Sequence, residues 1–276
     1  MYKKSMLEKI VVGILAVLVF GFFTIPIYWL VITSFKYGRD AFIIPPQWFF
    51  FTPTLHNYAD ALANSKSLMF IRNSLIITIL STLLSLLLGV PAGYAIARTK
   101  WRLLNTSSFF FLILLMVPPT AMLIPFYLIM RDMHLLGTYW AVILLDAAFN
   151  ASFVVWMMRS YFKDVPIEME EAALVDGASR LSAFVQVALP LSIPGIISSA
   201  LYCVIYSWND FIFALMLTSP QTKTIPLGIL ASFSASDVSW GQMTTLSVFA
   251  IIPAVVISMF LNRYFVQGLT MGATKG

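Results

Sequence analysis

The sequence has little charge, two histidines and a single cysteine. Charged residues make up 11% of its 276 residues and hydrophobic residues 60%, whereas a soluble domain carries about 25% charged residues. Such a composition leaves too little polar surface to cover a water-soluble globule of this size. A lipid bilayer removes that difficulty because its core is itself an apolar solvent. We therefore expect an integral membrane protein.

The scarcity of reactive side chains excludes several kinds of site. Cys203 stands alone in an apolar run, so it makes no disulfide within the chain and no zinc site of its own. His56 and His134 are far apart in sequence and suggest neither a metal site nor a catalytic triad. The net charge of +5 is scattered thinly among apolar runs. Such a distribution orients a chain in a membrane and does not indicate nucleic-acid binding.

Long apolar runs are abundant, and a spanning helix needs about 20 mainly apolar residues. We expect an all-α polytopic membrane protein with six transmembrane helices, forming a single transmembrane domain over residues 1–276. The first segment exceeds the apolar core of a secretory signal, about 7–15 residues, so we expect it to be retained. The six segments are Ile10–Ser34, Ile71–Ala97, Thr106–Met130, Thr138–Arg159, Ser192–Leu217 and Met243–Phe265.

The basic residues predict which side of the membrane each loop faces. Lys and Arg concentrate in loops on the inner side. Placing the N-terminus inside puts most of the 17 Lys and Arg residues on that side. The strongest part of this bias is the short loop that contains Arg98, Lys100 and Arg102. We therefore expect both termini to be cytoplasmic.

Small residues and prolines mark two of the predicted helices. Gly89 and Gly93 form a GxxxG pair on the second segment, and this spacing lets helix backbones approach closely. We expect it to serve packing within the chain. Pro118, Pro119 and Pro125 interrupt the backbone hydrogen bonds of the third segment. We therefore expect the third helix to be irregular.

The inner loop over residues 160–191 is longer than most connections, and long loops are often functional. Asp164 and Pro166 are helix-start signals and Gly177 is a stop signal, so the first short helix is expected from Pro166 to Asp176. Ser179 is expected to cap a second one that runs to about Ala188. The helical spacing predicts that one face of the second helix carries Leu181, Phe184, Val185 and Ala188.

Acidic residues form a predicted stripe on the first short helix. Asp164, Glu168 and Glu171 are spaced at i, i+4 and i+7 and so share a face. Like charges at this spacing destabilise a helix by a few tenths of a kcal/mol. Two interpretations remain open at this point: a basic partner surface that faces the stripe, or a solvated face beside the membrane.

The same loop resembles the inner-loop motif of permease subunits of bacterial ATP-binding-cassette (ABC) importers. That motif is Glu-Ala-Ala, three residues, Gly, nine residues, then Ile-x-Leu-Pro. This chain has Glu171-Ala172-Ala173, Gly177 and Val187-Ala188-Leu189-Pro190, with Val187 for Ile as the departure. Asp176-Gly177-Ala178, Phe184 and Trp208-Asn209-Asp210 resemble the carbohydrate branch, of the maltose-transporter type, and its smaller permease in particular.

The resemblance implies a set of partners. They are a homologous second permease, two ATPase subunits that bind ATP and Mg, and an extracytoplasmic sugar-binding protein, all at a bacterial plasma (inner) membrane. This chain lacks the G-x-x-x-x-G-K-[ST] motif and is expected to bind no cofactor and to be no enzyme. The outer loop near Trp48–Tyr58 is a candidate dock for the binding protein.

The resemblance also implies roles for particular residues. The C-terminal tail, about residues 268–276, is expected to contact the ATPase subunits through Gly268, Gly272 and Lys275. The inner loop is expected to form coupling helices that dock on the ATPase through Glu168, Glu171, Ala172, Ala173, Asp176, Gly177, Ala178, Leu189 and Pro190.

Polar residues inside the apolar segments have two interpretations. A charged residue at mid-membrane costs roughly 2.5–3.5 kcal/mol on insertion scales and usually faces a cavity or a partner. One interpretation is a solute path; the other is interhelical hydrogen bonding, with capping near a bend for Asp210. The path residues would be Asn150, Trp208, Asn209 and Asp210.

Alternatives to sugar import remain open at this stage. Within importers, the substrate is alternatively glycerol-3-phosphate, phosphate or an amino acid. A less favoured alternative is an intramembrane aspartyl protease that uses Asp146 and Asp210 as a dyad. Their contexts lack the Gly-x-Gly-Asp pattern expected of such enzymes. A transporter that works alone is disfavoured because six segments show no inverted repeat.

Overall fold

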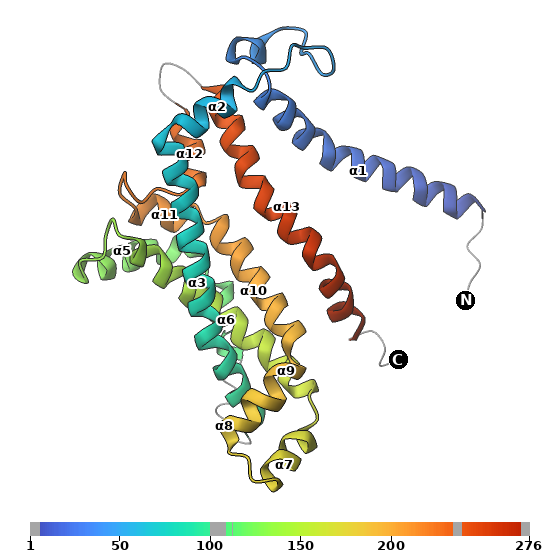
Figure 1. Ribbon diagram of the computed structural model, residues 1–276, viewed down its shortest axis with the longest axis vertical. Coiled ribbons are helices and arrows are strands. Elements are labelled where there is room, and N and C mark those ends of the chain that lie inside the picture. Colours follow the sequence, from blue (N-terminus) through green and yellow to red (C-terminus); the bar gives the residue numbers. More distant parts are fainter. Residues whose placement is uncertain (1–5, 100–108, 112, 234–238, 272–276) are drawn as a thin grey trace. The chain divides into compact units, whose positions relative to one another are not determined.

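The computed structural model describes residues 6–99, 109–111, 113–233 and 239–271 (Figure 1). Over these residues the chain is helical and forms no β-strand, and a single-residue β-bridge joins Gly137 to Thr218. The all-α prediction is therefore confirmed. The helices fall into two compact units, one made of Met1–Leu68 and Gly228–Ile252, the other of Met69–Leu227 and Pro253–Gly276. The predicted single domain stays a prediction.

The first unit contains α1 (Met6–Ser34), η1 (Gly38–Phe42), α2 (His56–Ala63) and the beginning of α13 (Trp240–Met271). The apolar window of α1 has no buried residue, as suits a helix whose side chains face lipid. Beyond α1, the chain folds around the buried Lys36. Its Nζ donates to the carbonyl of Gln47 at 2.5 Å and lies 4.4 Å from the centre of the Trp29 ring. Burial lowers the pKa of Lys36.

The second unit is built on α3 (Ser65–Arg98), α6 (Tyr139–Asp164) and α10 (Ile193–Trp208). Shorter helices and the C-terminal part of α13 complete it. The shorter helices are η2 (Pro119–Met122), α5 (Leu123–Asp132), α7 (Ile167–Val175), α8 (Arg180–Ala183), η3 (Phe184–Ala188), α9 (Leu189–Leu191), α11 (Ile212–Leu217) and the beginning of α12 (Ile225–Ala231). Val154, Met158 and Phe162 of α6 are fully buried beside Cys203 of α10. Figure 1 shows α7 and α8 at the end of this unit, next to the C-terminal end of α3 and the N-terminal end of α10.

Glycines bring α3 against α6. A Cβ atom added at Gly89 would lie 2.6 Å from the Cβ of Val154, and one added at Gly93 would lie 2.9 Å from the Cβ of Met158. A side chain larger than hydrogen therefore does not fit at either position without movement of α6. The predicted role of the GxxxG pair, packing within the chain, is confirmed.

The predicted spans agree with the structure in part. Among the described residues, α1, α3 and α6 are each long and apolar enough to cross a membrane, and two bent helix pairs raise the number of candidate spans to five. The third segment breaks into Phe109–Met116 and a part that begins at Pro119, which confirms the predicted irregularity. The sixth segment lies within α13. The count of six spans stays a prediction.

The prediction of one continuous helix over Ser192–Leu217 is wrong. The helix α10 ends at Trp208, and α11 begins at Ile212. The carboxylate of Asp210 accepts hydrogen bonds from the amides of Phe213 at 3.3 Å and Ala214 at 2.9 Å. A side chain that satisfies the first amides of a new helix favours a helix start there. The possible capping role of Asp210 near a bend is therefore confirmed.

Candidate functional site

The inner loop begins with a short helix whose limits match the prediction. The helix α7 follows Pro166 and is capped by Asp176 at its C-terminal end. Gly177 then takes a φ of +89°, a backbone conformation that favours glycine. The amide of Gly177 donates to the carbonyl of Leu174 at 3.1 Å, and the amide of Ala178 donates to the carbonyl of Ala173 at 3.0 Å. These two bonds form a Schellman motif, which fixes the sharp turn at this helix end.

A second helical stretch follows this turn. Ser179 caps α8, as predicted, because its hydroxyl accepts from the amide of Ser182 at 3.2 Å. The helix continues through η3, a π-helical turn, and through α9, and it then meets α10 at a bend of 76°. Pro190 of the motif lies inside α9, next to this bend.

The predicted apolar face of the second helix is wrong in part. Ala188 is buried and Phe184 is half-buried, but Leu181 is 71% exposed and Val185 is also exposed. The physical reason is the π-helical turn from Phe184 to Ala188, which places more residues in a turn than the 3.6 assumed for a regular helix. The buried face therefore rotates away from the predicted one.

The predicted acidic stripe is also altered. Asp164 is the last residue of α6 and does not belong to α7, because the extended Val165 and Pro166 separate the two helices. Glu168 and Glu171 are exposed on α7, as predicted for a partner-facing or solvated surface. Between them in sequence, Glu170 is buried and is the acidic residue that sequence analysis missed.

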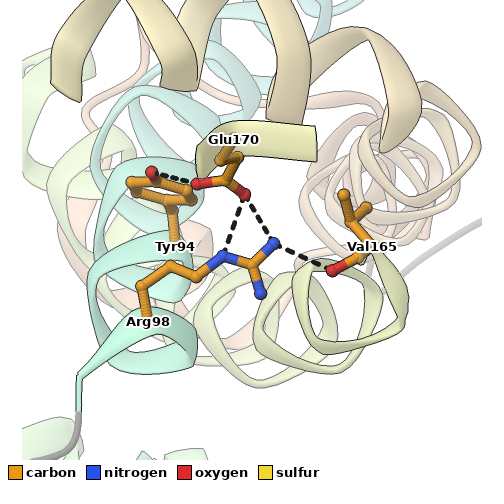
Figure 2. A network of polar contacts seen from close by, with 4 residues as sticks. All are labelled: Tyr94, Arg98, Val165 and Glu170. Carbon is orange, nitrogen blue, oxygen red and sulfur yellow. Dashed lines mark hydrogen bonds and ion pairs between the residues drawn. The ribbon is translucent and has the colours of Figure 1, made fainter. Parts of the chain in front are cut away.

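Glu170 joins α7 to the C-terminal end of α3 (Figure 2). Its Oε1 accepts from Nε of Arg98 at 2.9 Å and from the terminal Nη2 of Arg98 at 2.5 Å, and its Oε2 accepts from the hydroxyl of Tyr94 at 2.6 Å. The same Nη2 donates to the carbonyl of Val165 at 3.0 Å. Hydrogen bonds between charged groups are stronger than neutral ones, so this network is a firm junction.

Aromatic packing surrounds the junction. The ring of Tyr94 lies 4.5 Å from the ring of Phe184 and 5.3 Å from that of Phe162, measured between ring centres. Four elements therefore meet here: α3, α6, α7 and η3. The sequence does indicate that Tyr94 and Arg98 act together, because they are four residues apart and so share a helix face. The partner, Glu170, is 72 residues further along the chain than Arg98.

Apolar side chains are exposed beside the acidic residues of the inner loop. Val175 is 87% exposed and Leu181 is 71% exposed, and Ile167 and Met169 are exposed as well. Ala172 is exposed and Ala173 is half-buried. Exposed apolar residues rimmed by charged ones are typical of protein interaction surfaces.

The expected path residues lie in and beside the middle of the second unit. Asn150, which is fully buried, donates from Nδ2 to the hydroxyl of Ser207 at 3.0 Å, and Ser81 donates to the same hydroxyl at 2.9 Å. These bonds link α3, α6 and α10. Asp146 is fully buried one helical turn before Asn150. The structure thus brings Asp146 and Asn150 together with Ser207, which sequence analysis did not single out.

The remaining expected residues lie elsewhere. Trp208 is buried at the end of α10, while Asn209 is exposed and donates from its side chain to the carbonyl of Ile205 at 2.8 Å. Gly268 lies within α13, so the expected tail begins as helix. Gly272 and Lys275 lie outside the described residues, as do Lys100 and Arg102 of the predicted inner loop.

Residues 86–271 match the protein family described as the binding-protein-dependent transport system inner membrane component. The match includes most of the second unit and the whole inner loop. The chain belongs to this family. It is therefore the membrane-embedded permease of an ABC importer, and ATP hydrolysis takes place in a separate ATPase chain. Membership in this family argues against the two alternatives of an aspartyl protease and of a transporter that works alone.

Two relatives match the permease along nearly its whole length. The diacetylchitobiose uptake system permease protein DasC of Streptomyces coelicolor is 30% identical over 275 residues, which cover 99% of this chain and 100% of the relative. The trehalose/maltose transport system permease protein MalG of Thermococcus litoralis is 30% identical over 279 residues, which cover 99% of each chain.

A solved structure has the same fold. It is a chain of a bacterial ABC transporter involved in the import of the acidic polysaccharide alginate, with a TM-score of 0.79 and 23% sequence identity. The likeness covers 96% of this chain and 100% of that chain. The predicted fold class, a polytopic helical permease of ABC importer type, is therefore confirmed.

Proposed function

We propose that this permease imports a sugar or an oligosaccharide and is driven through α7 by a partner ATPase. The relatives named above transport diacetylchitobiose and trehalose or maltose according to their names. The sequence features shared with the carbohydrate branch support the same substrate class. Neutral, hydroxyl-rich solutes are held mainly by hydrogen bonds and by aromatic surfaces. The proposed path would supply both through Asn150, Trp208, Asn209 and Asp210.

The observation that carries the coupling proposal is the form of α7. This helix is fixed at its C-terminal end by the Gly177 turn and on one side by Glu170, while Glu168 and Glu171 remain exposed beside exposed apolar residues. A rigid element with an exposed mixed surface is suited to dock on another protein and to transmit its movement. The residues proposed to contact the ATPase are Glu168, Glu171, Ala172, Ala173, Asp176, Gly177, Ala178, Leu189 and Pro190.

The assembly proposed for this permease contains a homologous second permease, two ATPase subunits and an extracytoplasmic sugar-binding protein. ATP and Mg bind to the ATPase subunits, and this chain binds no cofactor. Both termini are cytoplasmic, which places α7 on the same side as the ATPase. The C-terminal tail then reaches the ATPase subunits from the inner end of α13.

The substrate proposal is tested by uptake into proteoliposomes that contain the whole transporter, with the binding protein present. Radiolabelled maltose, trehalose and diacetylchitobiose are compared with glycerol 3-phosphate and methionine. We expect ATP-dependent, saturable uptake of at least one of the sugars. Uptake of glycerol 3-phosphate or methionine without uptake of any sugar would overturn the sugar assignment and leave the coupling proposal intact.

A further inference from the structure

We infer that Glu170 and Arg98 form the mechanical link through which a movement of α7 reaches the membrane helix α3. This inference rests on the proposed function, since it requires α7 to be the element that the ATPase moves. It concerns a residue pair inside this chain and assigns a positioning role to Glu170, a buried neighbour of the exposed Glu171.

Neighbouring acidic residues of α7 point in different directions. Glu168 and Glu171 are exposed and are available to a partner, whereas Glu170 is 5% exposed and is turned toward α3. Both of its carboxylate oxygens accept hydrogen bonds from α3, one from the phenol of Tyr94 and the other from two nitrogens of Arg98. One face of α7 is therefore available to a partner, and the other face is bound to α3.

The junction resists sliding of α7 along α3. Arg98 also holds the carbonyl of Val165, in the extended segment between α6 and α7. Tyr94 packs against Phe162 of α6 and Phe184 of η3. As Figure 2 shows, the guanidinium lies between the carboxylate of α7 and the carbonyl of Val165. Charge-assisted bonds with fixed geometry couple two elements more rigidly than apolar contacts, which tolerate a shift in register.

The junction lies at the C-terminal end of α3. Arg98 is the last residue of α3, and Tyr94 lies one turn before it. Toward the N-terminal end of the same helix, Gly93 and Gly89 lie closely against α6, and the hydroxyl of Ser81 donates a hydrogen bond to Ser207 of α10. A force applied at Arg98 therefore acts on a helix that is packed on α6 and hydrogen-bonded to α10. Such a chain of packed contacts is the physical route by which distant sites become coupled.

The experiment places a reporter on α3 at a residue that makes none of the hydrogen bonds of the junction. Ala95 is exposed on the inner part of α3, and the native Cys203 is buried and so gives little background. In the Ala95→Cys transporter, with partner subunits present, we measure the rate of maleimide modification without nucleotide and after trapping with MgATP and orthovanadate. When the junction is unaltered, trapping should move α3 and so change the rate of maleimide modification at position 95.

The decisive variant is Glu170→Gln, which keeps the shape of the side chain and removes its charge. We expect the variant to copurify with the ATPase and to hydrolyse ATP, while the nucleotide-dependent change in modification at position 95 is lost. Arg98→Gln should behave in the same way. The control Lys163→Gln removes an exposed charge from the end of α6 and should retain the change in rate.

Several outcomes would overturn the inference. One is a nucleotide-dependent rate at position 95 that persists in Glu170→Gln. Another is that trapping does not change the rate of modification at position 95 in the transporter whose junction is unaltered. If the single variants lose the ATPase altogether, the reversed pair Arg98→Glu with Glu170→Arg decides. Recovery of the change in rate supports the link, and no recovery contradicts it. Failure of the ATPase to associate with the unaltered permease would instead overturn the proposed function.

Discussion

Arg98, the last residue of α3, donates two hydrogen bonds to one carboxylate oxygen of Glu170 in α7, at 2.9 and 2.5 Å. The side chains of the pair are 15% and 7% exposed. Water therefore screens this ion pair weakly, and each charge depends on the other for its solvation. The junction fixes α7 to α3, so that α7 is part of the helix packing of the second unit and not a free loop.

Removal of one member of this pair is expected to destabilise the permease. Glu170→Ala leaves the guanidinium of Arg98 buried without its main acceptor, and an uncompensated buried charge costs about 3–5 kcal/mol. The midpoint of thermal unfolding in detergent should fall markedly. The control Asp132→Asn removes a carboxylate that is 68% exposed and should leave the midpoint unchanged. Equal midpoints for both variants would show that the pair contributes little.

The close contact between α3 and α6 predicts a second loss of stability. Gly89→Ala puts a Cβ within 2.6 Å of the Cβ of Val154, and the required shift should cost about 1–3 kcal/mol. Thermal unfolding measures it. Gly13→Ala is the matched control, because a Cβ at Gly13 of α1 meets nothing within 4 Å. The prediction fails if the two alanine variants unfold at the same temperature.

The turn after α7 predicts a difference between two substitutions at one position. Gly177 has a φ of +89° and open space around its Cα, so alanine there meets backbone strain of about 1–2 kcal/mol and no steric contact. Asparagine tolerates this conformation better. Hydrogen exchange of the amides of Gly177 and Ala178 should therefore speed up more in Gly177→Ala than in Gly177→Asn. The reverse order would contradict the role of the turn.

A change of charge at the exposed face of α7 predicts uncoupling without misfolding. Glu171→Lys reverses a charge that is exposed to solvent, so the variant should insert and unfold like the unaltered protein. Its uptake of sugar should fall, because on the proposed function a lysine at this position would repel a basic partner surface that suits the acidic residues of α7. Uptake and copurification of the ATPase are measured in the same preparation. Full uptake in Glu171→Lys would remove this residue from the mechanism.

Local signals in the sequence predicted the inner loop well. Pro166, Gly177 and Ser179 set helix limits within a few residues of themselves, so a single stretch of sequence contains the information. The packing role of the GxxxG pair on α3 was equally predictable, because close approach of helices depends on the two glycines themselves. Composition alone was enough for the membrane environment.

Features that depend on distant contacts were not predictable. The partners Arg98 and Glu170 are far apart in sequence, and Arg98 served in the sequence analysis only as a sign of orientation. The break between α10 and α11 was foreseen only as a possible bend at Asp210, because apolar residues on both sides of Asn209 and Asp210 favoured one continuous segment. The π-helical turn at Phe184–Ala188 changed the period on which the predicted apolar face depended.

Site-specific crosslinking from α7 tests the central claim most directly. A photoreactive maleimide is attached to Ala172→Cys on the exposed part of the helix, in the full transporter in its membrane. We predict that illumination captures the ATPase subunit, and that the same probe on Lys66→Cys, which is exposed at the opposite end of α3, does not. Absence of the ATPase from the products at position 172, with the transporter still active, would contradict the account.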